Sequence, residues 1–271
     1  MLQNVQNLKD NAGNEDTKFQ RAYVDGKIGG LAVEAGRLHL NLVDGNLYDT
    51  RADGIVASYG KDVKVTGFYA KPTDQGKALN SAKLDPMYDL KASVEFDNVY
   101  GAKVDAKFGV VAATAGYTVF QDAALNGYEY VNDKAKLVES VDLDDNKIWN
   151  VGVAFDVAKN LNLSANYMKS SEKYVTDDDD AIVVGLSYAG AKAAKAGSFG
   201  IYANYYDQAR STVVAHTMNG EYGTHGFKGY MVGANYTFAK NIVGAVEYYD
   251  LEDKWNSNDL KTLWSQLVFT F

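Results

Sequence analysis

The feature that most constrains this chain is an alternation of apolar and polar residues in segments of about ten residues, repeated along most of its length. In YDLKASVEFD (Tyr88 to Asp97) every second residue is apolar, and the residues between are polar or charged. The final stretch LWSQLVFTF (Leu263 to Phe271) alternates as well. Because successive side chains of a strand point to opposite faces, each segment predicts a β-strand with one apolar and one polar face.

The number and length of these segments favour a membrane barrel. Segments of the same kind are Phe19 to Ile28, Val63 to Tyr69, Ala102 to Phe108, Trp149 to Phe155, Leu161 to Tyr167, Ile182 to Tyr188 and Tyr230 to Phe238. In all there are about fourteen, each long enough to cross a bilayer at a tilt. Short connections such as Gly29-Gly30 take turns with long polar ones such as Gln121 to Asn146 and Gln208 to His225. Outer-membrane barrels have such short turns on the periplasmic side and long loops outside.

Composition supports strands and excludes several classes of protein. The chain has 20 Tyr and 25 Gly but only 2 Pro and no Cys, which favours many strands and tight turns. A net charge of -8 argues against a nucleic-acid partner, because nucleic acid binds basic surfaces. The most apolar window, Phe108 to Phe120, is shorter than the roughly 20 residues of a spanning helix. No signal peptide follows Met1.

A single alternating segment would also fit a strand of a soluble sandwich. The whole set does not, because Tyr and Phe cluster near the ends of the apolar faces, as at Tyr69, Phe96, Tyr188 and Tyr236, where aromatic girdles of membrane barrels lie. We therefore predict an all-β fold, a transmembrane antiparallel β-barrel with short periplasmic turns and longer extracellular loops.

The polar faces predict a water-filled channel, because side chains alone do not fill a barrel of this size. The activity expected is passive diffusion of ions and small hydrophilic solutes. The predicted pore-lining residues are Tyr23, Asp25, Lys64, Lys91, Glu95, Lys103, Asp105 and Asn166.

One stretch resembles a known family. RAYVDG (21 to 26), the Gly-Gly turn, AGR (35 to 37) and DGIVASYG (53 to 60) resemble the outer-membrane porins, and together with the final LVFTF they look most like the OmpM-type porins. The resemblance implies sixteen strands, a homotrimer in the bacterial outer membrane, contact with lipopolysaccharide, and insertion by the barrel assembly machinery. It also implies an N-terminal S-layer-homology domain that binds peptidoglycan. Residues 1–271 would then be one barrel domain without that domain and without some upstream strands.

The resemblance also implies where the pore narrows. In such porins basic residues on the wall face acidic residues on an inward-folded loop, which here gives Arg21, Arg37 and Arg51 opposite Asp44, Asp49 and Asp53 of loop 41–53. Alternation from Leu31, Val33 and Ala35 points Arg37 toward lipid, so this assignment requires a bulge or the end of the membrane span. The last strand supplies the C-terminal assembly signal, Leu267, Phe269 and Phe271.

Two other functions remain open from the sequence: a barrel that anchors a tether without conducting, and a barrel-embedded enzyme. We expect no enzyme, no cofactor and no metal. The histidines His39, His216 and His225 lack zinc-site spacing, and the run Asp177 to Asp180 lacks a calcium-loop pattern, which makes it a solvated loop tip.

Overall fold

The computed structural model describes residues 2–5, 16–73, 79–80, 91–131, 134–174, 176–223 and 225–270. In these ranges the chain is almost entirely β-strand, with one short 3-10 helix, η1 (Arg210–Thr212). No helix in the described ranges has the length and apolar character needed to cross a membrane.

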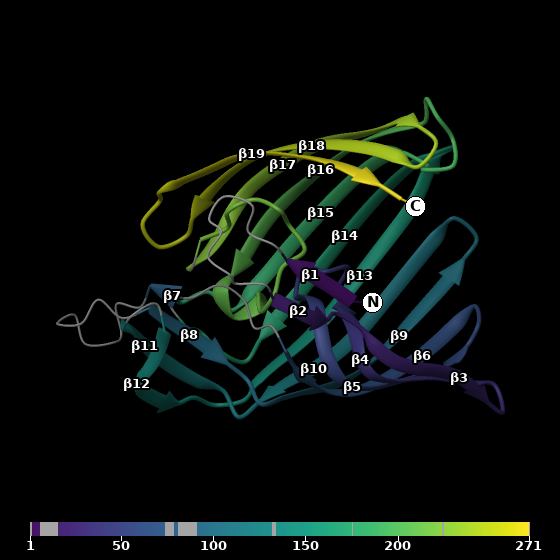
Figure 1. Cartoon of the computed structure of the whole chain (residues 1–271). Helices are drawn as coiled ribbons and strands as arrows, with labels where there is room; N and C mark the ends of the chain where they lie inside the picture. Colours follow the sequence, from purple (N-terminus) through teal and green to yellow (C-terminus); the bar gives the residue numbers. More distant parts are fainter. Residues whose placement is uncertain are drawn as a thin grey trace.

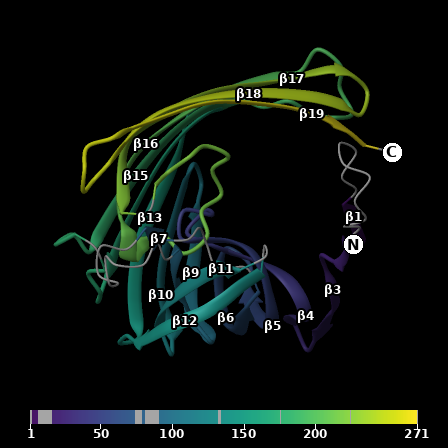
Figure 2. The same ribbon diagram turned by 60° about the vertical axis from the view of Figure 1, so that its left-hand side comes forward.

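Thirteen strands form one antiparallel sheet that curves around a central space (Figures 1 and 2). The strands, in their order across the sheet, are β3 (Ala22–Ile28), β4 (Leu31–Leu42), β5 (Tyr48–Gly60), β6 (Val63–Pro72), β9 (Asn98–Phe108), β10 (Val111–Gln121), β13 (Asn146–Ala158), β14 (Leu161–Ser170), β15 (Asp180–Ala189), β16 (Phe199–Ala209), β17 (Gly226–Ala239), β18 (Ile242–Asp253) and β19 (Asp259–Phe269). Within the described residues, β3 and β19 are its two edges. The predicted all-β antiparallel fold is confirmed. The wall has 13 strands in the described residues, close to the number of segments predicted.

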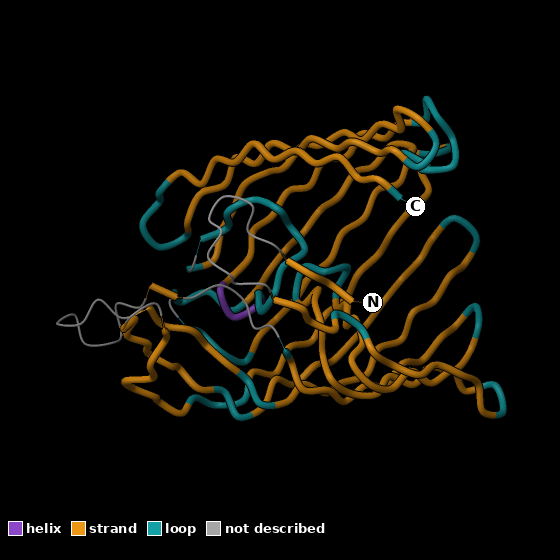
Figure 3. The backbone as a smooth tube through the Cα atoms, in the orientation of Figure 1, coloured by secondary structure: helices purple, strands orange, loops and turns teal. Residues whose placement is uncertain are grey.

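The connections alternate in length as the sequence predicts (Figure 3). Two-residue turns join β3 to β4, β13 to β14 and β17 to β18 at one end of the sheet. In the last two of these, Asn160 and Asn241 take positive φ of 64° and 65°, the left-handed conformation that tight hairpin turns require. The connections at the other end are longer, and one connection at the turn end, residues 190–198 between β15 and β16, is an exception because it is long as well.

The two faces of the sheet differ as the alternation requires. Val184, Ile201 and Leu263 on the convex face are 36%, 55% and 74% exposed. Their chain neighbours on the concave face include small, polar and buried residues, such as Gly200, Thr262 and Val183. An apolar outer belt around a polar interior is the reverse of a soluble barrel.

Two predicted features are wrong. The strand Tyr88 to Asp97 was expected in the wall, but its described part, β8 (Lys91–Glu95), belongs to a separate sheet with β7 (Leu79–Asn80), β11 (Ala124–Val131) and β12 (Lys134–Asp142). Phe96, expected in a lipid-facing girdle, is instead 3% exposed and contacts Phe120 with ring centroids 5.0 Å apart. Alternation gives the two faces of a strand but not the sheet that it joins. The predicted loop Gln121 to Asn146 accordingly contains the β11–β12 hairpin.

A further pair, β1 (Leu2–Val5) and β2 (Asp16–Phe19), forms a two-stranded antiparallel sheet just before β3.

Candidate functional site

The hairpin β4–β5 bends into the central space at a pair of glycines. Gly36 and Gly54 are register partners, and Gly36 has a φ of 126° that other residues rarely adopt. A Cβ on Gly54 would lie 2.5 Å from the Cα of Ala70 on the next strand. The segment beyond this pair, residues 37–53, is called the hairpin tip below.

One face of the hairpin tip packs against the concave wall. Leu38, Leu40, Leu42 and Tyr48 are at most 4% exposed, and they share one apolar cluster with wall residues Phe68, Val99, Phe120, Ile148 and Met168. The sequence pattern explains why this face of the tip packs against the wall. Apolar residues occupy odd positions up to Ala35 and even positions from Leu38, so the apolar face changes side at Gly36.

The turn at the end of the tip is held in an unusual conformation. Val43 and Asp44 have positive φ of 55° and 52°, which costs a β-branched residue roughly 1–2 kcal/mol. Asn46 offsets part of this cost, because its backbone and side-chain nitrogens donate to the Val43 carbonyl at 2.9 and 2.8 Å. The turn places Asp44 against β14, where Asn166 Nδ2 donates to Asp44 Oδ2 at 3.1 Å.

The other face of the hairpin tip carries the charges that the sequence singled out. Arg37 Nε and Nη2 donate to the two carboxylate oxygens of Asp53 at 2.7 and 2.6 Å. Asp49 Oδ1 lies 2.7 Å from His39 Nε2 and accepts from Asn41 Nδ2 at 2.8 Å. These side chains stay partly open to solvent, at 38% for Arg37 and 44% for Asp53.

This arrangement differs from the predicted one in two ways. Residues 41–53 were expected as a loop, whereas strands continue to Leu42 and resume at Tyr48. Arg37 was expected across the channel from Asp53, but the two residues face each other within one hairpin. The register between β4 and β5 continues through Gly36 without a bulge. Because the hairpin bends inward at this point, Arg37 does not point toward lipid.

A second segment pairs with the edge of the hairpin tip. The inward loop, defined as residues 210–225 between β16 and β17 and described except at residue 224, lies inside the curve of the sheet (Figure 2). The Leu47 carbonyl accepts the backbone N–H groups of Val214 and Ala215 at 2.9 and 3.1 Å, and the backbone N–H of Asp49 donates to the Ala215 carbonyl at 2.7 Å. The loop thus pairs in parallel with the tip at Tyr48 and Ala215.

His216 anchors the inward loop on the wall. Its ring is packed edge-on against Tyr206 of β16 and Phe227 of β17, with centroids 5.5 and 5.6 Å away. Nδ1 accepts the Met218 backbone N–H at 3.0 Å, so the proton of a neutral ring is on Nε2, which donates to Gln208 Oε1 at 3.1 Å. Burial lowers the pKa of His216 from 6.5 to about 3.

A carboxylate holds the far end of the same loop. Glu247 of β18 is 8% exposed; Asn219 Nδ2 of the loop donates to it at 3.0 Å and Tyr202 Oη of β16 at 2.8 Å. Tyr249 donates to the same carboxylate through its hydroxyl and accepts the Asn219 backbone N–H at 3.2 Å. The loop is therefore fixed on the wall at two places, His216 and Asn219.

Below the hairpin tip the concave wall forms a cavity of about 330 Å³. Four of the predicted pore-lining residues surround it, Lys64, Lys103, Asp105 and Asn166. They come from β6, β9 and β14, so the folding of the sheet brings together residues that are far apart in the sequence.

The remaining predicted residues are placed as follows. Tyr23 and Asp25 lie on β3, opposite Gly36 and Glu34 of β4, and Arg21 lies just before β3. Lys91 and Glu95 belong to β8, outside the wall sheet. Arg51 contacts Gln20. Leu267 and Phe269 on β19 are 52% and 53% exposed, whereas Phe271 lies outside the described residues.

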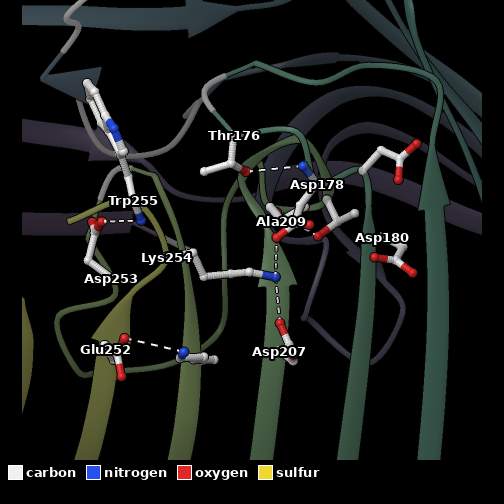
Figure 4. A network of polar contacts seen from close by, with 12 residues as sticks. Thr176, Asp178, Asp180, Asp207, Ala209, Glu252, Asp253, Lys254 and Trp255 are labelled. Atoms are coloured by element: carbon white, nitrogen blue, oxygen red, sulfur yellow. Dashed lines mark hydrogen bonds and ion pairs between the residues drawn. The ribbon is translucent and has the colours of Figure 1, made fainter. Parts of the chain in front are cut away.

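The acidic run forms ion pairs at the rim. Lys254 Nζ lies between Asp178 and Asp207, at 2.7 and 2.6 Å from their carboxylate oxygens (Figure 4). Lys169 Nζ donates to Asp179 at 2.6 Å, and this hydrogen bond lowers the pKa of the Asp179 carboxyl. Asp178 and Asp179, two of the four carboxylates in the run Asp177 to Asp180, therefore each have a lysine partner.

The sequence reasoning missed the inward loop as a structural element. Its signal was the apolar content of a segment read only as a long polar connection: Val213, Val214 and Tyr222 are at most 8% exposed. A loop that only faces solvent has no reason to bury such side chains.

Several solved structures have the same fold. No protein-family model matches the sequence, and no curated protein matches it. A loop L8 deletion mutant of OmpT, an outer membrane protein of Vibrio cholerae, matches with a TM-score of 0.56 and 16% identity over 94% of this chain and 81% of its own. A mutant Rh. blastica porin matches with a TM-score of 0.55 and 14% identity over 100% of this chain and 83% of its own. OmpT of Vibrio cholerae in its trimer form gives 0.54 and 17%, over 94% and 82%.

The chain therefore has the outer-membrane β-barrel fold. It is an integral outer-membrane protein, and its convex face carries a belt of exposed apolar side chains. The concave face encloses the lumen, and the hairpin tip and the inward loop lie within it.

Proposed function

We propose that this chain is a general diffusion porin, which passes ions and small hydrophilic solutes through a water-filled lumen narrowed by the hairpin tip and the inward loop. The observation that carries the proposal is the tip itself. One of its faces is sealed against the wall by leucines, while the opposite face holds paired charges that remain solvent-accessible. A barrel whose only role is anchoring has no need of a charged, open face inside its lumen.

The proposal assigns roles to the charges of the tip. Arg37, Asp49 and Asp53 form the narrow part, with Asp44 and Arg51 at its ends and Arg21 near its base. Because Arg37 and Asp53 neutralise each other at hydrogen-bond distance, their net field is small, and the passage they form is selective for size more than for charge.

Three further features belong to the proposal. The trimer form among the similar structures supports a homotrimer. The exposed Leu267 and Phe269, with Phe271, serve as the signal for the barrel assembly machinery. Likeness to OmpM-type porins, and with it contact with peptidoglycan through an S-layer-homology domain, remains a prediction from the sequence.

Single-channel recording in planar bilayers tests the proposal. The folded chain is expected to open in ohmic steps, grouped in threes if it is a trimer. Asn41→Trp adds bulk to the exposed face of the hairpin tip and should reduce the step size. The matched control Val65→Trp adds the same bulk to the lipid face, where Val65 is 50% exposed, and should leave the steps unchanged.

Two results would contradict the proposal. A barrel that resists heat and protease but never conducts would favour the anchor reading. Equal effects of Asn41→Trp and Val65→Trp would show that the hairpin tip does not limit the passage. The porin reading also makes the chain a channel rather than an enzyme.

A further inference from the structure

The cavity below the hairpin tip has a charge opposite to that of the whole protein. The chain carries a net charge of -8, yet four lysines line this cavity against three aspartates. The lysines are Lys61, Lys64, Lys103 and Lys107, and the aspartates are Asp44, Asp62 and Asp105. The lumen at this level is therefore locally basic.

The excess positive charge is concentrated at one point of the wall. Lys64 and Lys103 lie 3.9 and 3.4 Å from the same oxygen of Asp105, whose other oxygen accepts from Thr114 Oγ1 at 3.0 Å. Two ammonium groups thus share one carboxylate. Both lysines remain open to the lumen, at 46% and 35% exposure, so a solute can reach them.

Uncharged polar groups line the opposite side of the cavity. Asn166 is 6% exposed, and its Nδ2 donates to Asp44. Its Oδ1 lies over Gly152 and has no hydrogen-bond partner among the described residues. This oxygen is itself buried and has almost no accessible surface. Ser164 and Asn150 also line the cavity.

We propose that this cavity is a transient binding site for small monocarboxylates on their way through the lumen. The carboxylate lies between the ammonium groups of Lys64 and Lys103, where one positive charge is not compensated. The volume of about 330 Å³ admits a solute of the size of a sugar acid. This inference rests on the proposed diffusion function and gives it a preferred solute class.

Current interruption by gluconate, with glucose as the neutral probe of similar size, tests the site. Gluconate is expected to interrupt the open-channel current of the wild type in a saturable way, and glucose is not. In Lys64→Gln/Lys103→Gln the gluconate concentration for half-maximal interruption should rise about tenfold, since two exposed ammonium contacts are lost. Lys159→Gln/Lys240→Gln removes the same charge from two-residue turns and should behave as the wild type.

A second measurement separates failure of the site from failure of the channel. Gluconate should protect Lys64 and Lys103, but not Lys159 or Lys240, from an amine-modifying reagent in the detergent-solubilised barrel, read by mass spectrometry. A conducting channel in which gluconate and glucose act alike, or in which both double variants act alike, overturns the site and leaves the porin. A folded barrel that never conducts overturns the porin; protection of Lys64 and Lys103 then still supports the site, and absence of protection overturns it too.

Discussion

Acid should release the inward loop from the wall, with His216 as the group responsible. The neutral ring accepts the Met218 N–H on Nδ1 and donates from Nε2 to Gln208, so a second proton would face a donor. Around it pack Tyr206, Tyr222 and Phe227, and Asp49 is the acidic group that faces it. Among these groups, only Asp49 favours the charged ring.

The magnitude follows from the pKa of His216. Burial depresses it from 6.5 to about 3, so the docked loop binds fewer protons than the released loop anywhere between these two values. The stability of the docked loop is complete above pH 6.5 and falls as the pH drops toward 3. At pH 5 the loss is about 2 kcal/mol, which raises the ratio of released to docked loop about 30-fold.

A spin label on the loop measures this release. The chain has no Cys, so Glu221→Cys, at an exposed loop position, gives a single labelling site. The mobile fraction of the spectrum should rise between pH 7.5 and pH 5 in the wild type. In His216→Gln, whose amide makes both hydrogen bonds without taking a proton, the rise should be largely absent. An equal rise in both proteins would refute the role of His216 and point to carboxylates such as Asp49 or Glu247.

Two further predictions concern the β4–β5 hairpin. Gly54→Val places side-chain atoms against Ala70 and should abolish the heat-modifiable folded band in gel electrophoresis, whereas Val63→Ala on the lipid face should keep it; a normal band for Gly54→Val would show that the close approach is not required. Leu40→Ala should lower the free energy of unfolding in urea by about 2–5 kcal/mol, because Leu40 is 4% exposed in the apolar cluster. Its control is Leu263→Ala, at 74% exposure on the lipid face, and equal losses in both would contradict a packed tip.

The wall of the barrel was readable from the sequence because most wall strands have the same two faces, an apolar convex face and a concave face toward the lumen. Segments such as Leu161 to Tyr167 and Ile182 to Tyr188 fall within β14 and β15, and the predicted short connection Gly29-Gly30 joins β3 to β4. Period-two alternation carries that information locally, so no long-range contact is needed to see it.

The interior of the barrel was less readable because it depends on contacts between distant segments. The apolar positions change phase at Gly36, which signals a change of environment, but a bulge or the end of the span explains the same pattern. No local sequence pattern predicts that the Leu47 carbonyl pairs with the backbone N–H of Val214. The strand around Phe96 shows the converse limit, since its alternation was correct and its sheet was not.

The pairing of the hairpin tip with the inward loop also orders events during folding. Gln208 donates to the carbonyl of Asn46, a residue 162 positions earlier in the chain, at 3.3 Å. Contacts of such large sequence separation form late, because the entropy of closing the intervening segment must be overcome first. The Leu47 carbonyl of the hairpin tip therefore stays without its Val214 partner until β16 and β17 have joined the wall. Pairing of the hairpin tip with the inward loop thus takes place only after the C-terminal strands of the wall are in place.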